Sequence, residues 1–132
     1  MKKFGFELIS EEDVIIVNAS ISDHFKFRLA LDTAATHCTI DSNVLYFAGY
    51  DLKNSKGEYE VETANGIIRV ERFEVEKLEC LGIIKNNFEV QVYDFLAHGI
   101  ISEYDGVIGL NFLKNNKFCI DIPNKEISID LK

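Results

Sequence analysis

The most informative stretch of the sequence is Leu29-Ala30-Leu31-Asp32-Thr33-Ala34-Ala35-Thr36, where an apolar segment ends in an aspartate that small and hydroxyl-bearing residues follow. A carboxylate at the end of an apolar strand is costly unless it is hydrogen-bonded, and Thr33, Thr36 and nearby backbone amides can supply such bonds. In isolation, the same residues also suit a simple turn in which aspartate and threonine bind their own backbone. The rest of the sequence has to separate these two interpretations.

Alternation of apolar and polar residues dominates the chain and is typical of half-buried strands. It runs through residues 25–31, 88–92 and 127–131. Residues 14–17 are a continuous β-branched run, and a further strand is expected at 38–41. Residues 67–75 extend away from Asn65-Gly66, a pair that favours a two-residue hairpin turn because both positions tolerate positive φ.

Helical signals are few. Ser42 or Asn43 could cap a short helix that runs through Ala48, and residues 110–116 could form another helix before a strand at 118–121. The balance of elements predicts an all-β chain. The natural architecture for it is a small closed antiparallel β-barrel with one or two short helices.

The chain has 132 residues and 47% of them are hydrophobic, which predicts a single domain over residues 1–132 with a core of its own. The formal net charge is -8, and the 14 Lys and Arg residues are scattered along the sequence. Nucleic acid and anionic membrane surfaces are therefore not expected as partners, because both require a basic stripe. No signal peptide is visible, and no apolar run approaches the roughly 18 residues of a transmembrane helix.

The three cysteines, Cys38, Cys80 and Cys119, are widely spaced and form no CxxC pair, which favours a reducing cytoplasm. Phosphate-binding loops, serine-nucleophile elbows and Cys/His zinc clusters are missing from the sequence, so we expect no metal and no cofactor. His37 precedes Cys38 directly, and adjacent strand residues point to opposite faces. A Cys-His catalytic pair is therefore not expected.

Three segments, in this order along the chain, resemble the retropepsin-like aspartic peptidases, a family of single-lobe, retroviral-protease-like enzymes. Residues 30–36 look like the catalytic Asp-Thr-Gly-Ala-Ser/Thr loop with its apolar strand. Residues 62–67 are similar to the flap hairpin, and residues 105–113 resemble the apolar-apolar-Gly segment and helix that back the loop. The match runs from about residue 14 to the C-terminal strand, and the first and third motifs together make it fairly specific.

The resemblance implies a homodimeric aspartic endopeptidase. A single lobe carries one catalytic loop, so two copies would bring Asp32 from each subunit together at a two-fold axis. Two carboxylates at that separation share one proton, so one acts as base on the attacking water and the other as acid. The substrate would be an extended peptide or protein segment between the flaps and the dimer floor.

By the same resemblance, Thr33 would hydrogen-bond across the dimer axis and Thr36 would orient the Asp32 carboxylate. The flap and substrate-binding residues would be Ala64, Asn65, Gly66 and Ile67. The loop-backing segment would be Val107, Ile108 and Gly109. Four apolar residues are candidates to line the substrate pockets and are equally good core residues: Ile67, Ile68, Val107 and Ile108.

One position departs from the family pattern, because Ala34 replaces the usual glycine after Asp-Thr. Alanine keeps the backbone N–H that would donate to the carboxylate or the water, but it adds a methyl group and disfavours positive φ. The alternative function is therefore a catalytically impaired dimer of the same fold that binds peptides or proteins by strand addition. A third interpretation is a small all-β interaction domain whose Asp32 loops do not pack about a two-fold axis.

Overall fold

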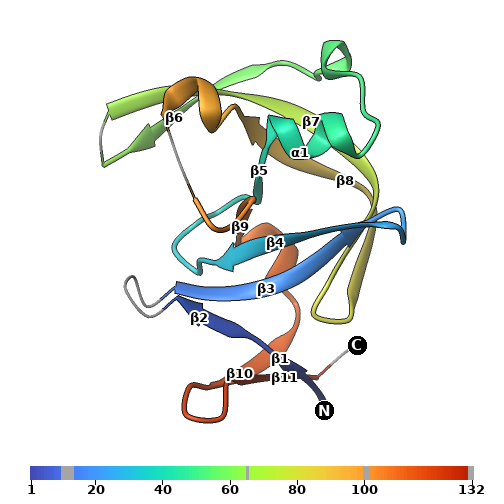
Figure 1. Cartoon of the computed structure of the whole chain (residues 1–132), viewed down its shortest axis with the longest axis vertical. Coiled ribbons are helices and arrows are strands. Elements are labelled where there is room, and N and C mark those ends of the chain that lie inside the picture. Colours follow the sequence, from blue (N-terminus) through green and yellow to red (C-terminus); the bar gives the residue numbers. More distant parts are fainter. Residues whose placement is uncertain (10–13, 65, 100–101, 131–132) are drawn as a thin grey trace.

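The computed structural model describes residues 1–9, 14–64, 66–99 and 102–130 of the chain (Figure 1). Its strands are β1 (Lys2–Gly5), β2 (Glu7–Ile9), β3 (Val14–Ile21), β4 (Phe25–Leu31), β5 (Thr39–Asp41), β6 (Glu58–Thr63), β7 (Gly66–Cys80), β8 (Ile83–Tyr93), β9 (Gly106–Ile108), β10 (Lys117–Asp121) and β11 (Glu126–Asp130). Its helices are α1 (Ser42–Phe47), α2 (Leu110–Leu113) and two 3-10 turns, η1 (Leu52–Asn54) and η2 (Leu96–His98).

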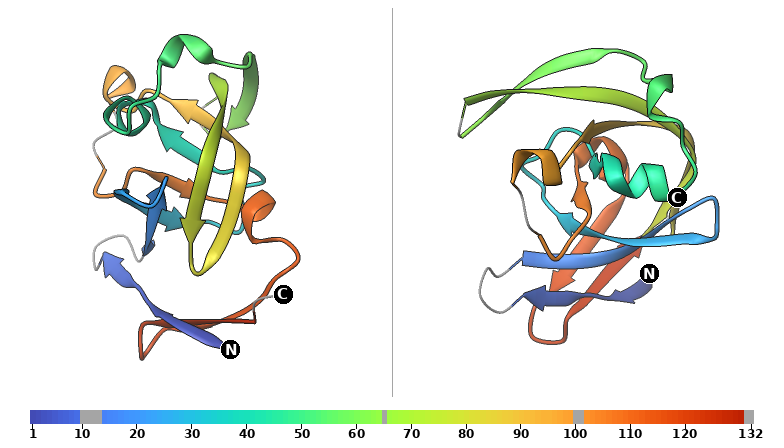
Figure 2. Two further views of the ribbon diagram at one scale, coloured as in Figure 1. Left: turned by 90° about the vertical axis from the view of Figure 1, so that its right-hand side faces the viewer. Right: turned by 45° about the horizontal axis from the view of Figure 1, so that its top comes forward.

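The strands form a ring. Within the described residues the larger sheet has the order β2-β3-β4-β9-β5-β8-β7-β6, and an additional pairing between β3 and β7 joins its two sides. A three-stranded sheet, β1-β11-β10, lies beside the ring (Figure 2). The predicted all-β fold that closes on itself is confirmed. Two pairings in the ring, β4–β9 and β5–β8, are parallel rather than antiparallel as expected, because single-strand alternation does not reveal the direction of the partner.

Both sheets share one core. The largest fully buried side chains among the described residues are Phe73, Phe112, Ile16, Ile21, Leu29, Ile40, Leu45, Leu78, Ile108, Leu113, Ile127 and Ile129. Removing each such side chain from water stabilises the fold by roughly 1.5–3 kcal/mol. Alternation predicted the inward face of β4 at Phe27 and Leu29, but Ala30 is buried as well. Ala30 lies between two neighbouring strands, in register with Ile16 of β3 and Val107 of β9. Leu29 and Ala30 point to opposite faces of β4 and are both buried, so β4 is covered on both faces near its end.

The longest strand, β7, takes part in two hairpins. It pairs with β6 and then with β8, and Leu81 and Gly82 form the second turn with φ values of 52° and 74°. Gly66 is in register with Thr63, so β6 and β7 remain paired up to these two residues. The predicted Asn65-Gly66 turn includes a position that the structure does not describe. Asn65 itself lies outside the described residues.

The helices are short, as predicted, but their ends differ from the expectation. Asp41, rather than Ser42 or Asn43, caps α1, because its carboxylate accepts the backbone N–H of Asn43 at 3.2 Å. The second helix ends at Leu113 instead of residue 116, and Asn115 adopts a φ of 73°. A residue in this left-handed conformation cannot continue an α-helix. None of the described helices has the length and apolar character needed to cross a membrane.

Candidate active site

Asp32 lies at the end of β4, where the parallel pairing with β9 continues beyond the strand. Leu31 is in register with Ile108, and the backbone N–H of Asp32 donates to the Ile108 carbonyl at 3.1 Å. The Asp32 carbonyl in turn accepts the N–H of Ala35 at 3.1 Å. Both backbone polar groups of Asp32 are therefore hydrogen-bonded, while its side chain is exposed. The fold thus fixes the aspartate backbone and presents its carboxylate to solvent.

The carboxylate is held by the residue that departs from the family pattern. The backbone N–H of Ala34 donates to Asp32 Oδ1 at 2.9 Å, which closes an Asx-type turn. Ala34 is not among the residues with positive φ, so its methyl group causes no left-handed backbone strain. The side chains of Thr33 and Ala34 are exposed beside the carboxylate. The loop therefore accommodates alanine without positive φ, and the Ala34 backbone N–H donates to the carboxylate.

Gly109 allows α2 to approach the loop closely. A Cβ atom at this position would lie 2.7 Å from the carbonyl oxygens of both Ala35 and His37. The next residue, Leu110, donates its N–H to the Ala35 carbonyl at 2.8 Å. The loop-backing segment predicted from the sequence is thus in direct backbone contact with the loop that carries Asp32.

Asn111 fastens the far end of the same loop, and sequence reasoning did not single it out. Its N–H donates to the Thr36 carbonyl at 3.1 Å, and its side-chain Oδ1 accepts the N–H of Cys38 at 2.9 Å. An asparagine inside the apolar segment 107–113 is the one signal that could have indicated this role. A polar side chain there needs a partner, and the loop backbone provides it.

Asp105, the residue before β9, is hydrogen-bonded to both β4 and β5. Its Oδ2 accepts the N–H of Arg28 at 3.0 Å, and its own N–H donates to the Arg28 carbonyl at 2.8 Å. Its carbonyl accepts the N–H of Asp41 at 2.8 Å. Asp105 therefore anchors the start of β9 between β4 and β5.

Cys38 is buried and has no access to solvent. Burial raises the pKa of its thiol to about 11, although hydrogen bonds from the backbone of Gly109 and Phe112 oppose the shift. Gly109 N–H lies 3.4 Å from Cys38 Sγ. A protonated, buried thiol is a poor nucleophile, so the structure favours an inert packing role for Cys38.

The Thr36 hydroxyl contacts a neighbour other than the predicted one. Its Oγ1 lies 3.0 Å from Nδ1 of His37, and both side chains are exposed. In the described part of the chain Thr36 makes no hydrogen bond to the Asp32 carboxylate. The orienting role of Thr36 stays a prediction.

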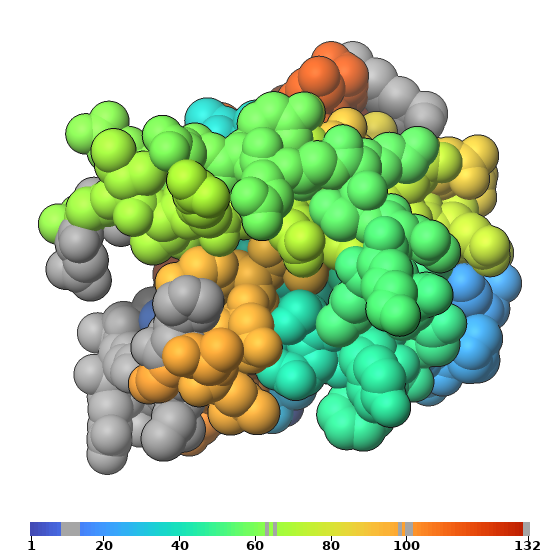
Figure 3. Space-filling model, turned by 90° about the horizontal axis from the view of Figure 1, so that it is seen from above, coloured from blue at the N-terminus to red at the C-terminus, as the bar shows by residue number. Residues whose placement is uncertain are grey.

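The β6–β7 hairpin and the Asp32 loop lie on the same side of the molecule (Figures 1 and 2). In the view from above, the hairpin runs along one edge and extends beyond the body of the chain (Figure 3). Ala64 and Gly66 are exposed, and Ile67 exposes 69% of its surface. At the base of the hairpin, the Arg72 guanidinium lies 3.0 Å from the ring centroid of Tyr59. Of the predicted flap residues, Ala64, Gly66 and Ile67 lie in this hairpin, whereas Val107 and Ile108 belong to β9 and Gly109 is the N-cap of α2.

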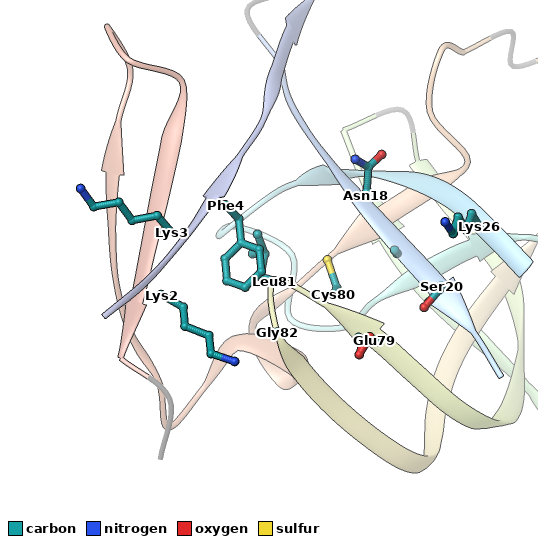
Figure 4. A pocket seen from close by; sticks show the side chains of 11 residues that line it. Lys2, Lys3, Phe4, Asn18, Ser20, Lys26, Glu79, Cys80, Leu81 and Gly82 are labelled. Atoms are coloured by element: carbon teal, nitrogen blue, oxygen red, sulfur yellow. The ribbon is translucent and has the colours of Figure 1, made fainter. Parts of the chain in front are cut away.

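A cavity of about 650 Å³ lies between β1, β3 and the β7–β8 turn. Figure 4 shows Phe4 and Leu81 on one side of it and Asn18 and Ser20 on the other. Its lining includes no residue of the Asp32 loop, the β6–β7 hairpin or β9. We assign it no part in the active site. The described residues also contain no group of three or more His, Cys, Asp or Glu side chains placed to hold a metal ion.

Comparison with known proteins identifies the family. A model of the family described as gag-polyprotein putative aspartyl protease matches residues 17–115. The chain belongs to this family. The match begins in β3 and ends just after α2, so it includes both the Asp32 loop and the segment that backs it. The predicted retropepsin-like relationship is confirmed.

A solved structure supports the fold of this aspartyl protease family member. It is described as a retropepsin-like aspartic protease from Rickettsia conorii, with 19% sequence identity and a TM-score of 0.69. The alignment covers 98% of this chain and 99% of that chain. No curated protein sequence matches the chain. Family and fold together support a peptidase of the retropepsin type.

Proposed function

We propose that two copies of this chain form an aspartic endopeptidase, with one Asp32 from each copy. The observation that carries the proposal is the exposed Asp32 carboxylate at the end of β4, on a loop whose backbone is tied to β9 and α2. The described chain has one such loop, and the chemistry needs two carboxylates. A two-fold axis through this loop supplies the second one.

In the proposed reaction the two carboxylates share one proton. The ionised Asp32 removes a proton from a water molecule, and that water attacks the carbonyl carbon of the peptide bond. The protonated Asp32 of the other copy donates its proton to the carbonyl oxygen. The first Asp32 then donates the proton it took from water to the amide nitrogen, and the C–N bond breaks as the other Asp32 takes back the hydroxyl proton of the tetrahedral intermediate. Activity falls at high pH, where the shared proton is lost, and at low pH, where no base remains.

The neighbouring residues have supporting roles in this proposal. Ala34 N–H holds one oxygen of the carboxylate at 2.9 Å, and Thr33 is exposed where it can bond across the axis. The β6–β7 hairpin acts as the flap, and exposed Ile67 contacts the substrate. The free thiols Cys38 and Cys80 are both buried, which suits a reducing compartment, so we place the enzyme in the cytoplasm.

The test is cleavage of a diverse peptide library from about pH 4 to pH 7, with Asp32→Asn prepared in parallel. Asp32→Asn should abolish cleavage while analytical ultracentrifugation shows an unchanged dimer. Glu76→Gln is the matched control, since it makes the same carboxylate-to-amide change at an exposed position on β7. It should leave cleavage unchanged.

Two results would contradict the proposal. Full cleavage by Asp32→Asn would remove the aspartate from the mechanism. A chain that is monomeric at every concentration tested, yet cleaves, would exclude the paired site. A folded dimer that binds peptides without cutting them would instead support the catalytically impaired binding module.

A further inference from the structure

A second cavity, of about 340 Å³, lies between the loop that follows Asp32 and strands β7 and β8. Its lining combines His37 from the loop, Arg72 from β7, Lys85 from β8, and Asn111 and Lys114 from α2 and the residue after it. This volume lies at the small end of the range of ligand pockets in proteins. It is large enough for one side chain or a small ion with part of its shell.

The cavity collects positive charge in an acidic protein. The net charge of the chain is -8, yet Arg72, Lys85 and Lys114 share this lining with a single acidic residue, Glu89. Glu89 is already paired, since its Oε1 lies 3.3 Å from Nε of Arg72. In the described part of the chain, neither Lys85 nor Lys114 has an ion-pair partner. Two ammonium groups therefore remain available to an anion.

The neutral groups of the lining also provide donors. Asn111 uses Oδ1 to accept the Cys38 N–H, so its Nδ2 donor is the part of the amide left for a ligand. Lysine and asparagine nitrogen donors together match an oxygen anion, whereas they have no acceptor to offer a cation. Phe88 adds an apolar wall, and its ring packs edge-on against Phe112 with the centroids 5.5 Å apart.

The position of the cavity indicates where the anion comes from. His37 belongs to the loop that carries Asp32 and lies 3.0 Å from the Thr36 hydroxyl. Arg72 belongs to the strand that continues from the β6–β7 hairpin and lies against Tyr59 at its base. The cavity therefore adjoins the loop and the base of the hairpin, the two elements that enclose the substrate in the proposed function, and Asp32 is not part of its lining.

We propose that this cavity binds the carboxylate of an acidic side chain in the substrate peptide, away from the bond that is cut. The inference rests on the proposed function, because it uses the same loop and hairpin to hold the peptide. It specifies the substrate class as peptides with a glutamate or aspartate outside the cleavage site. Binding such a residue offsets the repulsion that an acidic peptide meets from the rest of this acidic protein.

Binding can be measured without cleavage by using the Asp32→Asn chain. Backbone amide shifts of residues 85–91 and 111–114 would be followed by NMR while acetyl-Glu-Glu-Glu-amide, acetyl-Gln-Gln-Gln-amide or inorganic phosphate is added. The dissociation constant obtained from these shifts should be at least fivefold lower for the glutamate peptide than for the glutamine peptide. The reason is that a charge-assisted hydrogen bond is about twice as strong as a neutral one. The pair Lys85→Gln and Lys114→Gln should remove that preference.

A matched control has the same charge change elsewhere. Lys2→Gln with Lys26→Gln removes two lysines that line the other cavity, and it should leave the glutamate preference intact. Equal weakening by both double variants would show a general charge effect and overturn the site. If phosphate binds as tightly as the glutamate peptide, the cavity binds a free anion. The proposal that its ligand is an acidic side chain of the substrate is then overturned.

The active enzyme supplies the second test. Substrates recovered from the library would be compared with versions in which each Glu is replaced by Gln. Lys85→Gln with Lys114→Gln should raise KM for the glutamate substrate roughly tenfold and leave kcat unchanged. If the wild-type chain cleaves nothing but Asp32→Asn still prefers the glutamate peptide, the proposed function fails while the anion site stands. If cleavage is robust and indifferent to Glu, the anion site fails alone.

Discussion

The loop that carries Asp32 and the β6–β7 hairpin are held in place by different means. The loop is tied to β9 and α2 by backbone hydrogen bonds from Asp32, Leu110 and Asn111. The hairpin has β6 at the edge of the described sheet, and its base is stabilised by surface side chains such as Arg72 on Tyr59. A substitution that forces backbone atoms apart near the loop should therefore lower stability strongly. Removing a single side chain contact from the hairpin should lower it only weakly.

Gly106→Ala should give the largest effect. A Cβ atom there would overlap the Thr39 carbonyl oxygen and lie 3.0 Å from Ile40 Cα, and backbone atoms cannot move aside cheaply. We expect a loss of more than about 3 kcal/mol in the free energy of unfolding measured with urea. Gly5→Ala is the control, since its nearest neighbour would be 4.0 Å away.

Gly66→Ala makes the same substitution in the β6–β7 hairpin, so its cost can be compared directly with that of Gly106→Ala. Gly66→Ala meets no atom within 4 Å, but its φ of 113° is strained for alanine. Its cost should be about 1–3 kcal/mol and local to the hairpin. A larger loss for Gly66→Ala than for Gly106→Ala would show that the hairpin, not the strand that supports the loop, is the more demanding region.

Much of the loop was predictable because its signal is local. The sequence 29–36 shows an apolar strand, an aspartate and its hydroxyl-bearing neighbours in one stretch, and alternation identifies the strands on either side. The N–H of Ala34 reaches Asp32 over two residues, so this contact also follows from the sequence. The resemblance to a known family added the backing segment 107–109.

The remaining features depend on contacts between distant positions. Cys38 and Asn111 are 73 residues apart, and Arg28 and Asp105 are 77 apart. Nothing near either residue in the sequence specifies its partner. Parallel pairing of β4 with β9 is set by how the chain returns to the sheet, and the need for glycine at 106 becomes visible only when Thr39 lies against it.

The buried thiols provide the third prediction. The pKa of Cys38 is raised to about 11, and burial also raises that of Cys80. The unfolded chain therefore loses these protons at lower pH than the folded chain, so the stability present below the ordinary thiol pKa is lost as pH rises. The free energy of unfolding should fall by roughly 1 kcal/mol per thiol between pH 9 and pH 10.

Urea unfolding of two variants isolates this effect from other groups that titrate in the same range. Cys38→Val should show a shallower decline with pH than the wild type, whatever its stability at pH 7. Cys119→Ser removes an exposed thiol and should decline as steeply as the wild type. Equal slopes for wild type and Cys38→Val would mean that solvent reaches the Cys38 thiol before the chain unfolds.

Tyr59→Leu tests the base of the hairpin. Loss of the Arg72 contact over the ring should reduce stability by about 0.5–1 kcal/mol, the usual range for an exposed cation–π pair. Hydrogen exchange should accelerate at the paired amides of β6 and stay unchanged at Asp32 and Ala35. Tyr59→Phe keeps the ring and should behave like the wild type. Faster exchange at the Asp32 loop would show that the two regions are coupled.

Arg69→Gln should have the smallest effect. Arg69 on β7 is in register with Glu60 on β6, and its guanidinium lies 3.7 Å from the carboxylate of the diagonal neighbour Glu58. The side chains of Arg69 and Glu58 are 73% and 61% exposed. Water screens such a pair, and holding two long side chains together costs entropy, so its contribution is below about 0.5 kcal/mol. Thermal unfolding in low and high salt should give nearly the same difference from the wild type. A loss comparable to that of Tyr59→Leu would mean that surface charge, rather than the contact at its base, sets the stability of the hairpin.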